Sequence, residues 1–220
     1  MTDVRFRYAA GAPPIFDGLN LGIDMDSRIA IVGANGAGKT TLLNLIRGEL
    51  RPSDGVCSIS PHARIAIFSQ HHVDGLDLRQ TPLEYMLSSF PASDGLKHEE
   101  RMRAHLSSFG VETELAQQRM YTLSGGQKSR VAFAKVTYNR PAILLLDEPS
   151  NHLDMEAVDA LIRGLLSYGG GILMVSHDEY LIKNVVDELL IVEGGRARHF
   201  QGDFLEYKRQ LRGAHPPVSV

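Results

Sequence analysis

A glycine-rich loop between an apolar run and a helical stretch constrains the fold of this chain more than any other feature. The stretch GANGAGKTT covers Gly33–Thr41 and fits the spacing G-x-x-x-x-G-K-[ST]. It follows the apolar run Ile29–Val32 and leads into Thr40–Arg47, which we expect to be a helix. A strand before the loop and a helix after it are the context that this motif requires. Because its glycines let the backbone turn and direct N–H groups at phosphate oxygens, the loop predicts a nucleoside triphosphate site.

Side chains near this loop predict how the phosphates are held. Lys39 should reach the β- and γ-phosphates, and the Thr40 hydroxyl should bind Mg²⁺. The stretch ILLLDEPSNHLD contains a buried strand that ends at Asp147, whose carboxylate we expect beside the loop, holding Mg²⁺ through water. Glu148 follows directly and is the candidate to polarise an attacking water molecule.

Two further polar residues come directly after predicted strands. Gln70 closes the run IAIFSQ, and His177 follows ILMVS. The glutamine amide is a candidate contact to the metal ion, and the histidine a candidate contact to the γ-phosphate. Each residue alone is more often structural, but together with the phosphate loop they predict a catalytic site that also contains Glu148.

Strands and helices alternate along the chain, which predicts an α/β fold. The continuous apolar runs Ile143–Leu146 and Ile172–Val175 are typical of strands covered on both faces. Between them, apolar residues at helical spacing predict an amphipathic helix; they are Val158, Leu161, Ile162, Leu165 and Leu166. We therefore expect a P-loop NTPase core with a parallel sheet, built around a β-α-β unit.

The rest of the chain predicts additions to this core. Val56–Ile59 and Arg64–Phe68 are interpreted as two strands of a hairpin around Pro61, part of an antiparallel β subdomain at the sheet edge. Helical and charged sequence predicts an inserted α-helical subdomain over about 81–135. We expect one domain over 1–212, ending in the weak strand Ala197–Phe200 and a polar helix from Asp203, with a disordered tail over 213–220.

Composition excludes several classes of protein. The net charge of −3 and the pI near 6.3 give no overall attraction to nucleic acid or anionic membranes. The single cysteine, Cys57, cannot form an internal disulfide, and it is interpreted as a packing residue. No run approaches the length of a membrane span, and no signal peptide is present. We expect a soluble cytoplasmic protein without a membrane partner.

The stretch LSGGQKSR, Leu123–Arg130, predicts a second helix start suited to an anion. Helix N-termini present free N–H groups, and here a serine and two glycines precede a basic first turn. Ser124 also has a purely structural interpretation, because serine is a favoured helix N-cap. The phosphate loop already serves this chain's own nucleotide, so the sequence leaves open which phosphate this helix meets.

The phosphate loop, strand-end glutamine, LSGGQ, strand-end Asp-Glu and strand-end histidine, in this order, resemble the nucleotide-binding domain of ATP-binding-cassette (ABC) proteins. The resemblance covers nearly the whole chain and implies an ATPase that converts ATP and water to ADP and phosphate with Mg²⁺. It implies that Tyr8 stacks on the adenine, with Phe6, expected on the same strand face, as the competing candidate. The residues it assigns to ATP binding are Tyr8, Gly33, Asn35, Gly36, Ala37, Gly38, Lys39, Thr40 and Thr41. The metal residues are Thr40, Gln70 and Asp147.

In that family two cassettes pair head to tail, and each ATP lies between one phosphate loop and the other cassette's LSGGQ. The resemblance thus assigns a second group of residues to a nucleotide held by a partner cassette. These residues are Ser124, Gly125, Gly126, Gln127 and Asp154.

Other stretches resemble the ABC-F class, whose soluble members carry two cassettes and act on ribosomes. SNHLD at Ser150–Asp154 is close to the TNHLD of that class, whereas transporter cassettes usually have SALD. Phe68–Pro91, Leu123–Ala134 and Gly202–Lys208 look like the second cassette of eukaryotic ABC-F proteins linked to translation control. The resemblance implies a partner cassette and a ribosome as partners, although the charged linker between cassettes has no counterpart here.

Two alternatives remain at this stage. The chain could be the ATPase subunit of an ABC transporter, docking on a membrane partner through its helical subdomain. It could also be a module that binds nucleotide but hydrolyses it weakly when isolated, since its LSGGQ then lacks a permanent partner.

Overall fold

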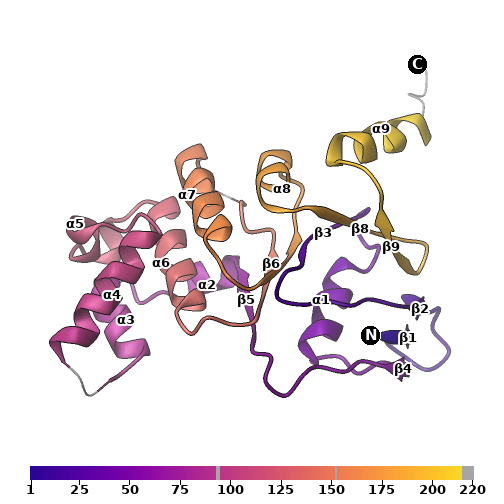
Figure 1. The fold of residues 1–220 in the computed structure, drawn as a ribbon, viewed down its shortest axis with the longest axis horizontal. Coiled ribbons are helices and arrows are strands. Elements are labelled where there is room, and N and C mark those ends of the chain that lie inside the picture. Colours follow the sequence, from indigo (N-terminus) through magenta and orange to yellow (C-terminus); the bar gives the residue numbers. More distant parts are fainter. Residues whose placement is uncertain (93–94, 152, 215–220) are drawn as a thin grey trace.

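The computed structural model describes residues 1–92, 95–151 and 153–214, as an elongated molecule with its helical region at one end (Figure 1). The expected disordered tail over 213–220 is only partly covered. The last helix continues to Ala214, beyond the expected boundary, and 215–220 lie outside the described residues. In the described part of the chain, no helix is both long and apolar enough to cross a membrane.

A six-stranded sheet forms the centre, in the order β5-β6-β7-β3-β8-β9. Its strands are β3 (Arg28–Val32), β5 (Ile65–Ser69), β6 (Ile143–Asp147), β7 (Gly171–Val175), β8 (Glu188–Glu193) and β9 (Arg196–Phe200). All neighbours pair in parallel except β8 and β9, which are antiparallel. The parallel sheet and the β-α-β unit predicted from the apolar runs are confirmed.

Alternate residues of the central strands enter different hydrophobic clusters, because successive side chains of a strand point to opposite faces. Leu144 and Leu146 pack with α6 (Gly125–Thr137) and α7 (Met155–Leu166). Leu145 faces the other cluster, which contains α1 (Lys39–Arg47). Burial on both faces explains why β6 has a continuous apolar sequence rather than an alternating one.

A small antiparallel sheet packs beside α1, in the order β2-β1-β4. It consists of β1 (Thr2–Phe6), β2 (Phe16–Leu19) and β4 (Asp54–Val56). The antiparallel sheet was expected, but the hairpin was wrong. Of the first predicted strand, Val56–Ile59, only Val56 lies in a strand, as the last residue of β4, and 57–59 have no regular structure. β4 pairs with β1 and β5 pairs with β6, so no hairpin forms around Pro61. Both pairings join segments far apart in the sequence, and a local turn signal such as Pro61 cannot reveal them.

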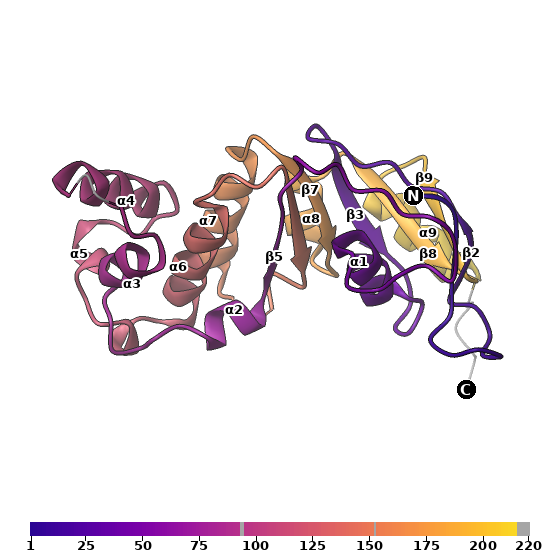
Figure 2. The same cartoon turned by 90° about the horizontal axis from the view of Figure 1, so that it is seen from below.

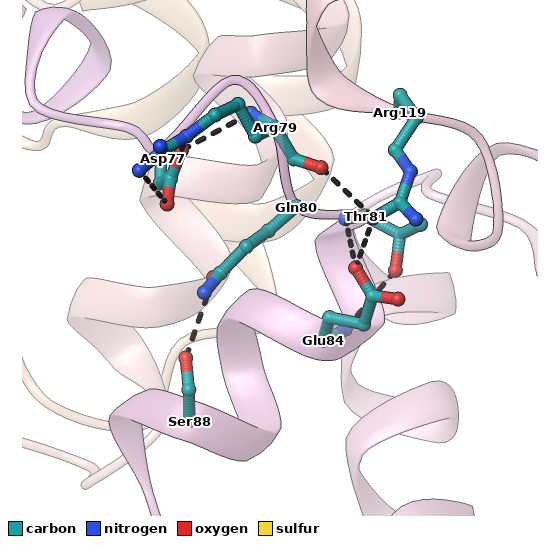
Figure 3. A network of polar contacts seen from close by, with 7 residues as sticks. All are labelled: Asp77, Arg79, Gln80, Thr81, Glu84, Ser88 and Arg119. Carbon is teal, nitrogen blue, oxygen red and sulfur yellow. Dashed lines mark hydrogen bonds and ion pairs between the residues drawn. The ribbon is translucent and has the colours of Figure 1, made fainter.

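Five short elements and α6 fill the region after β5. They are α2 (Gln70–Asp74), α3 (Pro82–Ser89), α4 (Leu96–Ser108), α5 (Thr113–Ala116) and the 3₁₀ turn Met120–Thr122. Figures 1 and 2 place α3, α4 and α5 together, away from α1 and the small sheet. Thr81 begins α3 with a capping box, in which its hydroxyl accepts from Glu84 N while Glu84 accepts from Thr81 N. Arg119 donates to Glu84 as well, which links α3 to the segment just before the 3₁₀ turn (Figure 3).

The C-terminal elements cover the remaining part of the large sheet. Helix α8 (Glu179–Val185) contributes Ile182, and α9 (Phe204–Ala214) contributes Phe204 and Tyr207, to a cluster with Ala30 and Val32 of β3. The predicted strand before the last helix is confirmed as β9. In α7 the expected apolar face is buried except for Leu166, which is 60% exposed where the helix ends.

Candidate functional site

The phosphate loop connects the centre of the large sheet to α1. β3 lies between β7 and β8, and the loop follows its last residue, Val32. Gly33 has φ 156°, and a Cβ atom there would lie 2.4 Å from the backbone oxygen of Val192 on β8. Only glycine fits this close approach. The predicted helix begins at Lys39, and its N-cap, Gly38, has a left-handed conformation and no side-chain cap.

Lys39 and two carboxylates face the same side of this loop. Lys39 Nζ donates to the carbonyl oxygens of Gly33 and Ala34, at 2.8 and 3.0 Å. Asp147 ends β6, and Glu148 is the next residue. Burial raises the pKa of Asp147, while the positive charge of Lys39 lowers it to a smaller extent. The chain thus keeps a cation beside an acidic group that is partly withdrawn from water.

Glu148 has a strained backbone conformation directly after β6, at the start of the loop that leads to α7. Its φ is +47°, unusual for a residue with a side chain, and its backbone N–H donates to Val175 O at 2.8 Å. His177 Nε2 lies 3.5 Å from Glu148 Oε1. Burial is the largest effect on Glu148 and raises its pKa, whereas the charge interaction with His177 lowers it. A carboxylate held at a strained position beside a histidine is an arrangement that functional sites often contain.

These groups line one open pocket at the carboxyl ends of the parallel strands. From the predicted site it contains Tyr8, Asn35, Gly36, Gly38, Lys39, Thr40, Thr41, Asp147, Glu148 and His177, and in addition Ile15 and Val175. Gly33 and Ala37 belong to the same loop, and Gly33 O accepts from Lys39. Most of the residues predicted to bind one nucleotide are therefore together in space.

The aromatic candidates separate clearly. β1 ends at Phe6, so the expectation that Phe6 and Tyr8 share a strand face was wrong. Phe6 is 4% exposed and belongs to the core, whereas Tyr8 is 64% exposed and lines the pocket. The Tyr8 hydroxyl lies 2.9 Å from Thr41 Oγ1. Of the two rings, only Tyr8 is accessible to a base.

Some predicted positions are described less completely. Gln70 begins α2 directly after Ser69, which pairs with Asp147 across β5 and β6, so its backbone lies at the pocket edge of the sheet. Its side chain is outside the described part of the structure, as is His152 of the SNHLD stretch.

The predicted oxygen ligands suit Mg²⁺. The Thr40 hydroxyl and the Asp147 carboxylate line the same pocket. Mg²⁺ prefers few protein oxygens together with phosphate and water, rather than a complete protein cage. The described residues contain no cluster of three or more His, Cys, Asp or Glu side chains suited to a metal.

The second helix start has a different construction. Ser124 is the N-cap of α6, and its hydroxyl accepts from Gln127 N at 3.2 Å. Gln127 Oε1 in turn accepts from Ser124 N at 2.9 Å, which completes a capping box. The structural interpretation of Ser124 as a cap therefore holds, whatever else the helix start contacts.

Gly126 and Asp154 lie against each other within this chain. A Cβ atom on Gly126 would lie 2.7 Å from Ala157 Cβ and 3.4 Å from Asp154 Oδ1. Asp154 caps α7 by accepting from Ala157 N at 2.8 Å. The structure thus brings together Ser124, Gly125, Gly126, Gln127 and Asp154 at the neighbouring starts of α6 and α7. None of them lines the pocket of the phosphate loop.

Sequence reasoning missed the residues that support the site. Ile15 lies against the phosphate loop, because its side chain would be 2.9 Å from a Cβ on Gly38. Ser176 and Asp178 fix the turn around His177: Asp178 N donates to Ser176 Oγ, and Asp178 caps α8. Ile15 falls in a loop without periodicity, so no signal marks it. The pattern Ser-His-Asp before an apolar helix is a recognisable cap signal.

Known proteins are similar to this chain in sequence and in fold. A model of the family described as ABC transporter matches residues 16–151. ABC transporter F family member 3 of Arabidopsis thaliana is 56% identical over 97% of this chain and 29% of its own length. Protein GCN20 of Saccharomyces cerevisiae is 48% identical over 94% of this chain and 27% of its own length. The chain thus spans less than a third of these relatives.

Solved structures agree at the level of the fold. The dimeric structure of MJ0796, a bacterial ABC transporter cassette, matches with a TM-score of 0.70 at 24% identity, over 91% of this chain and 98% of that one. The resemblance stated from the motifs is confirmed by the matched family model and the relatives. The chain belongs to the ABC transporter family, as an ATP-binding cassette and ATPase domain of the ABC-F class.

Proposed function

We propose that this cassette binds and hydrolyses Mg²⁺-ATP by pairing head to tail with a second cassette, within a cytoplasmic ABC-F protein that acts on ribosomes. The observation that carries the pairing is the separation of the two predicted half-sites. Lys39, Thr40 and His177 line one pocket, which no residue of Ser124–Gln127 lines. Glu148 lies between the two regions, because it also lines a neighbouring pocket with Gly125 and Lys128. A nucleotide that contacts both a phosphate loop and an LSGGQ helix start would therefore take the LSGGQ from another chain or cassette.

Within the pocket, each side chain has a distinct task. Lys39 supplies positive charge beside the β- and γ-phosphates, and the phosphate loop supplies N–H donors. Mg²⁺, held by Thr40 and Asp147, would neutralise charge that develops on the phosphates during transfer. Glu148 accepts a hydrogen bond from the attacking water and orients it in line with the bond that breaks. His177 lies 3.5 Å from Glu148 and lines the same pocket, so we assign it to orienting that carboxylate and contacting the γ-phosphate.

The position of Glu148 suits this role. Its backbone is held by the bond to Val175 O, and its carboxylate is partly buried, so little reorganisation is needed before reaction. Asn35, Gly36, Ala37 and Thr41 surround the phosphates from the loop and the first turn of α1, and Tyr8 provides a platform for the base. We assign Gln70 to the metal side of the pocket because its backbone follows Ser69, the neighbour of Asp147.

Glu148→Gln tests the catalytic assignment. We expect this variant to keep ATP binding, to lose turnover by two orders of magnitude or more, as expected for removal of a general base, and to accumulate an ATP-dependent dimer on a sizing column. Glu114→Gln, which neutralises an exposed carboxylate on α5, is the matched control and should behave as the parent chain. Equal single-turnover rates for Glu148→Gln and the parent would remove Glu148 from this role.

The ribosomal part of the proposal rests on the similarity to ABC-F proteins and has its own test. Co-sedimentation of the full-length protein with ribosomes across a salt series should show ATP-dependent binding that weakens with salt. A full-length reading frame with membrane-spanning segments, together with no ribosome binding, would instead favour the transporter subunit. A chain that binds ATP but neither dimerises nor hydrolyses it would be a nucleotide-binding module only.

A further inference from the structure

Tyr8 is an exposed ring with few contacts to hold it. It lies beyond the end of β1, at the rim of the pocket, and 64% of it is exposed. The Phe6 and Tyr8 rings form a T-shaped pair, with a centroid distance of 5.0 Å and an interplanar angle of 83°. Among the described residues, the Tyr8 side chain has one hydrogen-bond partner, Thr41 Oγ1 at 2.9 Å. A ring this exposed would otherwise sample several rotamers.

Thr41 is a rigid partner for this bond. It belongs to the first turn of α1 and is 6% exposed, whereas its neighbour Thr40 is exposed. A threonine hydroxyl can donate one hydrogen bond and accept two. Thr41 can therefore accept from Tyr8 and still donate to a phosphate oxygen, so the bond to Tyr8 is compatible with a bound nucleotide.

An apolar side chain, Ile15, lines the pocket together with Tyr8. Beside Tyr8 lies Ile15, whose backbone N–H donates to Phe6 O. The charged side chains of the pocket, Lys39, Asp147 and Glu148, belong to the phosphate loop and the strand ends. Under the proposed role of Tyr8, stacking on its ring is the contact to the base that this chain offers, so the position of the ring matters for binding.

We infer that the Tyr8 hydroxyl is a positioning group: its bond to Thr41 holds the ring in the orientation that receives the base, before the nucleotide arrives. The inference rests on the proposed role of Tyr8 as the base platform and adds a requirement for tyrosine rather than any aromatic residue. Loss of the hydroxyl leaves the stacking surface intact, but the ring must then be ordered on binding. Ordering one such side chain weakens binding by about two- to tenfold.

Tyr8→Phe tests this inference, with ADP, GDP and pyrophosphate as ligands, none of which requires turnover or pairing. We expect the dissociation constants of ADP and GDP to rise by about two- to tenfold, and that of pyrophosphate to stay within twofold. Tyr121→Phe, which changes a ring that is 65% exposed elsewhere, is the matched control and should bind all three as the parent does. In a Thr41→Val background, Tyr8→Phe should cause no additional loss, because the partner is already absent.

The possible outcomes separate this inference from the platform assignment. Unchanged ADP and GDP binding in Tyr8→Phe overturns the positioning role. An equal loss for pyrophosphate also overturns it, because the hydroxyl would then act on the phosphates. Tyr8→Ala should lose more than Tyr8→Phe for ADP, through loss of stacking; if it binds ADP as the parent does, the platform assignment itself is wrong.

Discussion

Two helices of this chain start beside glycines, and the two starts are constructed in opposite ways. α1 begins after Gly38, in a left-handed conformation, without a side-chain cap. α6 begins after Ser124, with a complete capping box between Ser124 and Gln127. The first four N–H groups of a helix need partners from outside it. α6 supplies part of that need from its own residues, whereas no side chain caps α1.

The residues around the two helix starts differ in the same way: those around α1 form a site with several charged groups, whereas those around α6 do not. Around α1 the chain adds a lysine, two carboxylates and a histidine in the same pocket. Around α6 it adds a close packing contact, Gly126 against Ala157, and a second helix cap, Asp154. The start of α1 is organised for an anion held by this chain, and the start of α6 is first of all a stable surface. In the proposed pairing, its use as an anion site depends on a partner that brings the anion.

The largest expected difference between the two helix starts is the loss of ADP affinity when a lysine is removed from each. We expect Lys39→Gln to weaken ADP binding by about 10- to 100-fold, since a hydrogen bond to a charged group contributes about 1.5–3 kcal/mol. Lys128→Gln neutralises a lysine in the first turn of α6 and should leave ADP affinity within about twofold, because Lys128 lies outside the pocket of the phosphate loop. Isothermal titration on the isolated chain measures both. Equal losses in the two variants would contradict the division between a complete and a partial site.

Adding a methyl group at Gly126, where α6 packs against Ala157 of α7, should give the next largest effect. This effect is on stability rather than on binding. In Gly126→Ala the new methyl group would lie 2.7 Å from Ala157 Cβ, and such overpacking costs about 1–3 kcal/mol. The matched control is Gly125→Ala, where a Cβ meets nothing within 4 Å. Thermal unfolding without nucleotide should show a lower midpoint for Gly126→Ala only. Identical midpoints for the two variants would show that α6 and α7 are not in tight contact at Gly126.

The sequence was informative wherever a residue's neighbours in the chain decide its structure. Gly33–Thr41 predicted a strand, a loop and a helix, and β3 and α1 have those positions. The apolar runs predicted β6 and β7, because burial on both faces leaves a continuous apolar pattern. Strand-end residues such as Asp147 and His177 converge because parallel strands end at one edge of the sheet.

Prediction from the sequence failed where contacts between distant segments of the chain decide the structure. The pairing of β4 with β1 overrode the local hairpin signal around Pro61. Strand alternation could not show which of Phe6 and Tyr8 is accessible, because β1 ends at Phe6. The two rings differ in exposure, which only the folded chain reveals: Phe6 is buried and Tyr8 is exposed. Ile15 packs against the phosphate loop from a segment without periodicity, so only the folded chain reveals its place.

Gln127→Glu should have the smallest effect on stability. It tests most directly whether the start of α6 only caps its helix or also faces a partner's phosphates. Glutamate also completes a capping box, and its negative charge is favourable at a helix N-terminus by about 0.3–1 kcal/mol. The unfolding midpoint should therefore stay constant or rise slightly, whereas Gln127→Ala, which loses the bond from Ser124 N, should fall slightly. Pairing should respond in the opposite direction, because a carboxylate at this helix start would repel the phosphates of the partner's nucleotide. Both variants are measured by thermal unfolding without nucleotide and by ATP-dependent dimerisation in the Glu148→Gln background. If Gln127→Glu dimerises as well as the Glu148→Gln parent, the start of α6 does not face the partner's phosphates, and its capping box is only a structural feature of the helix.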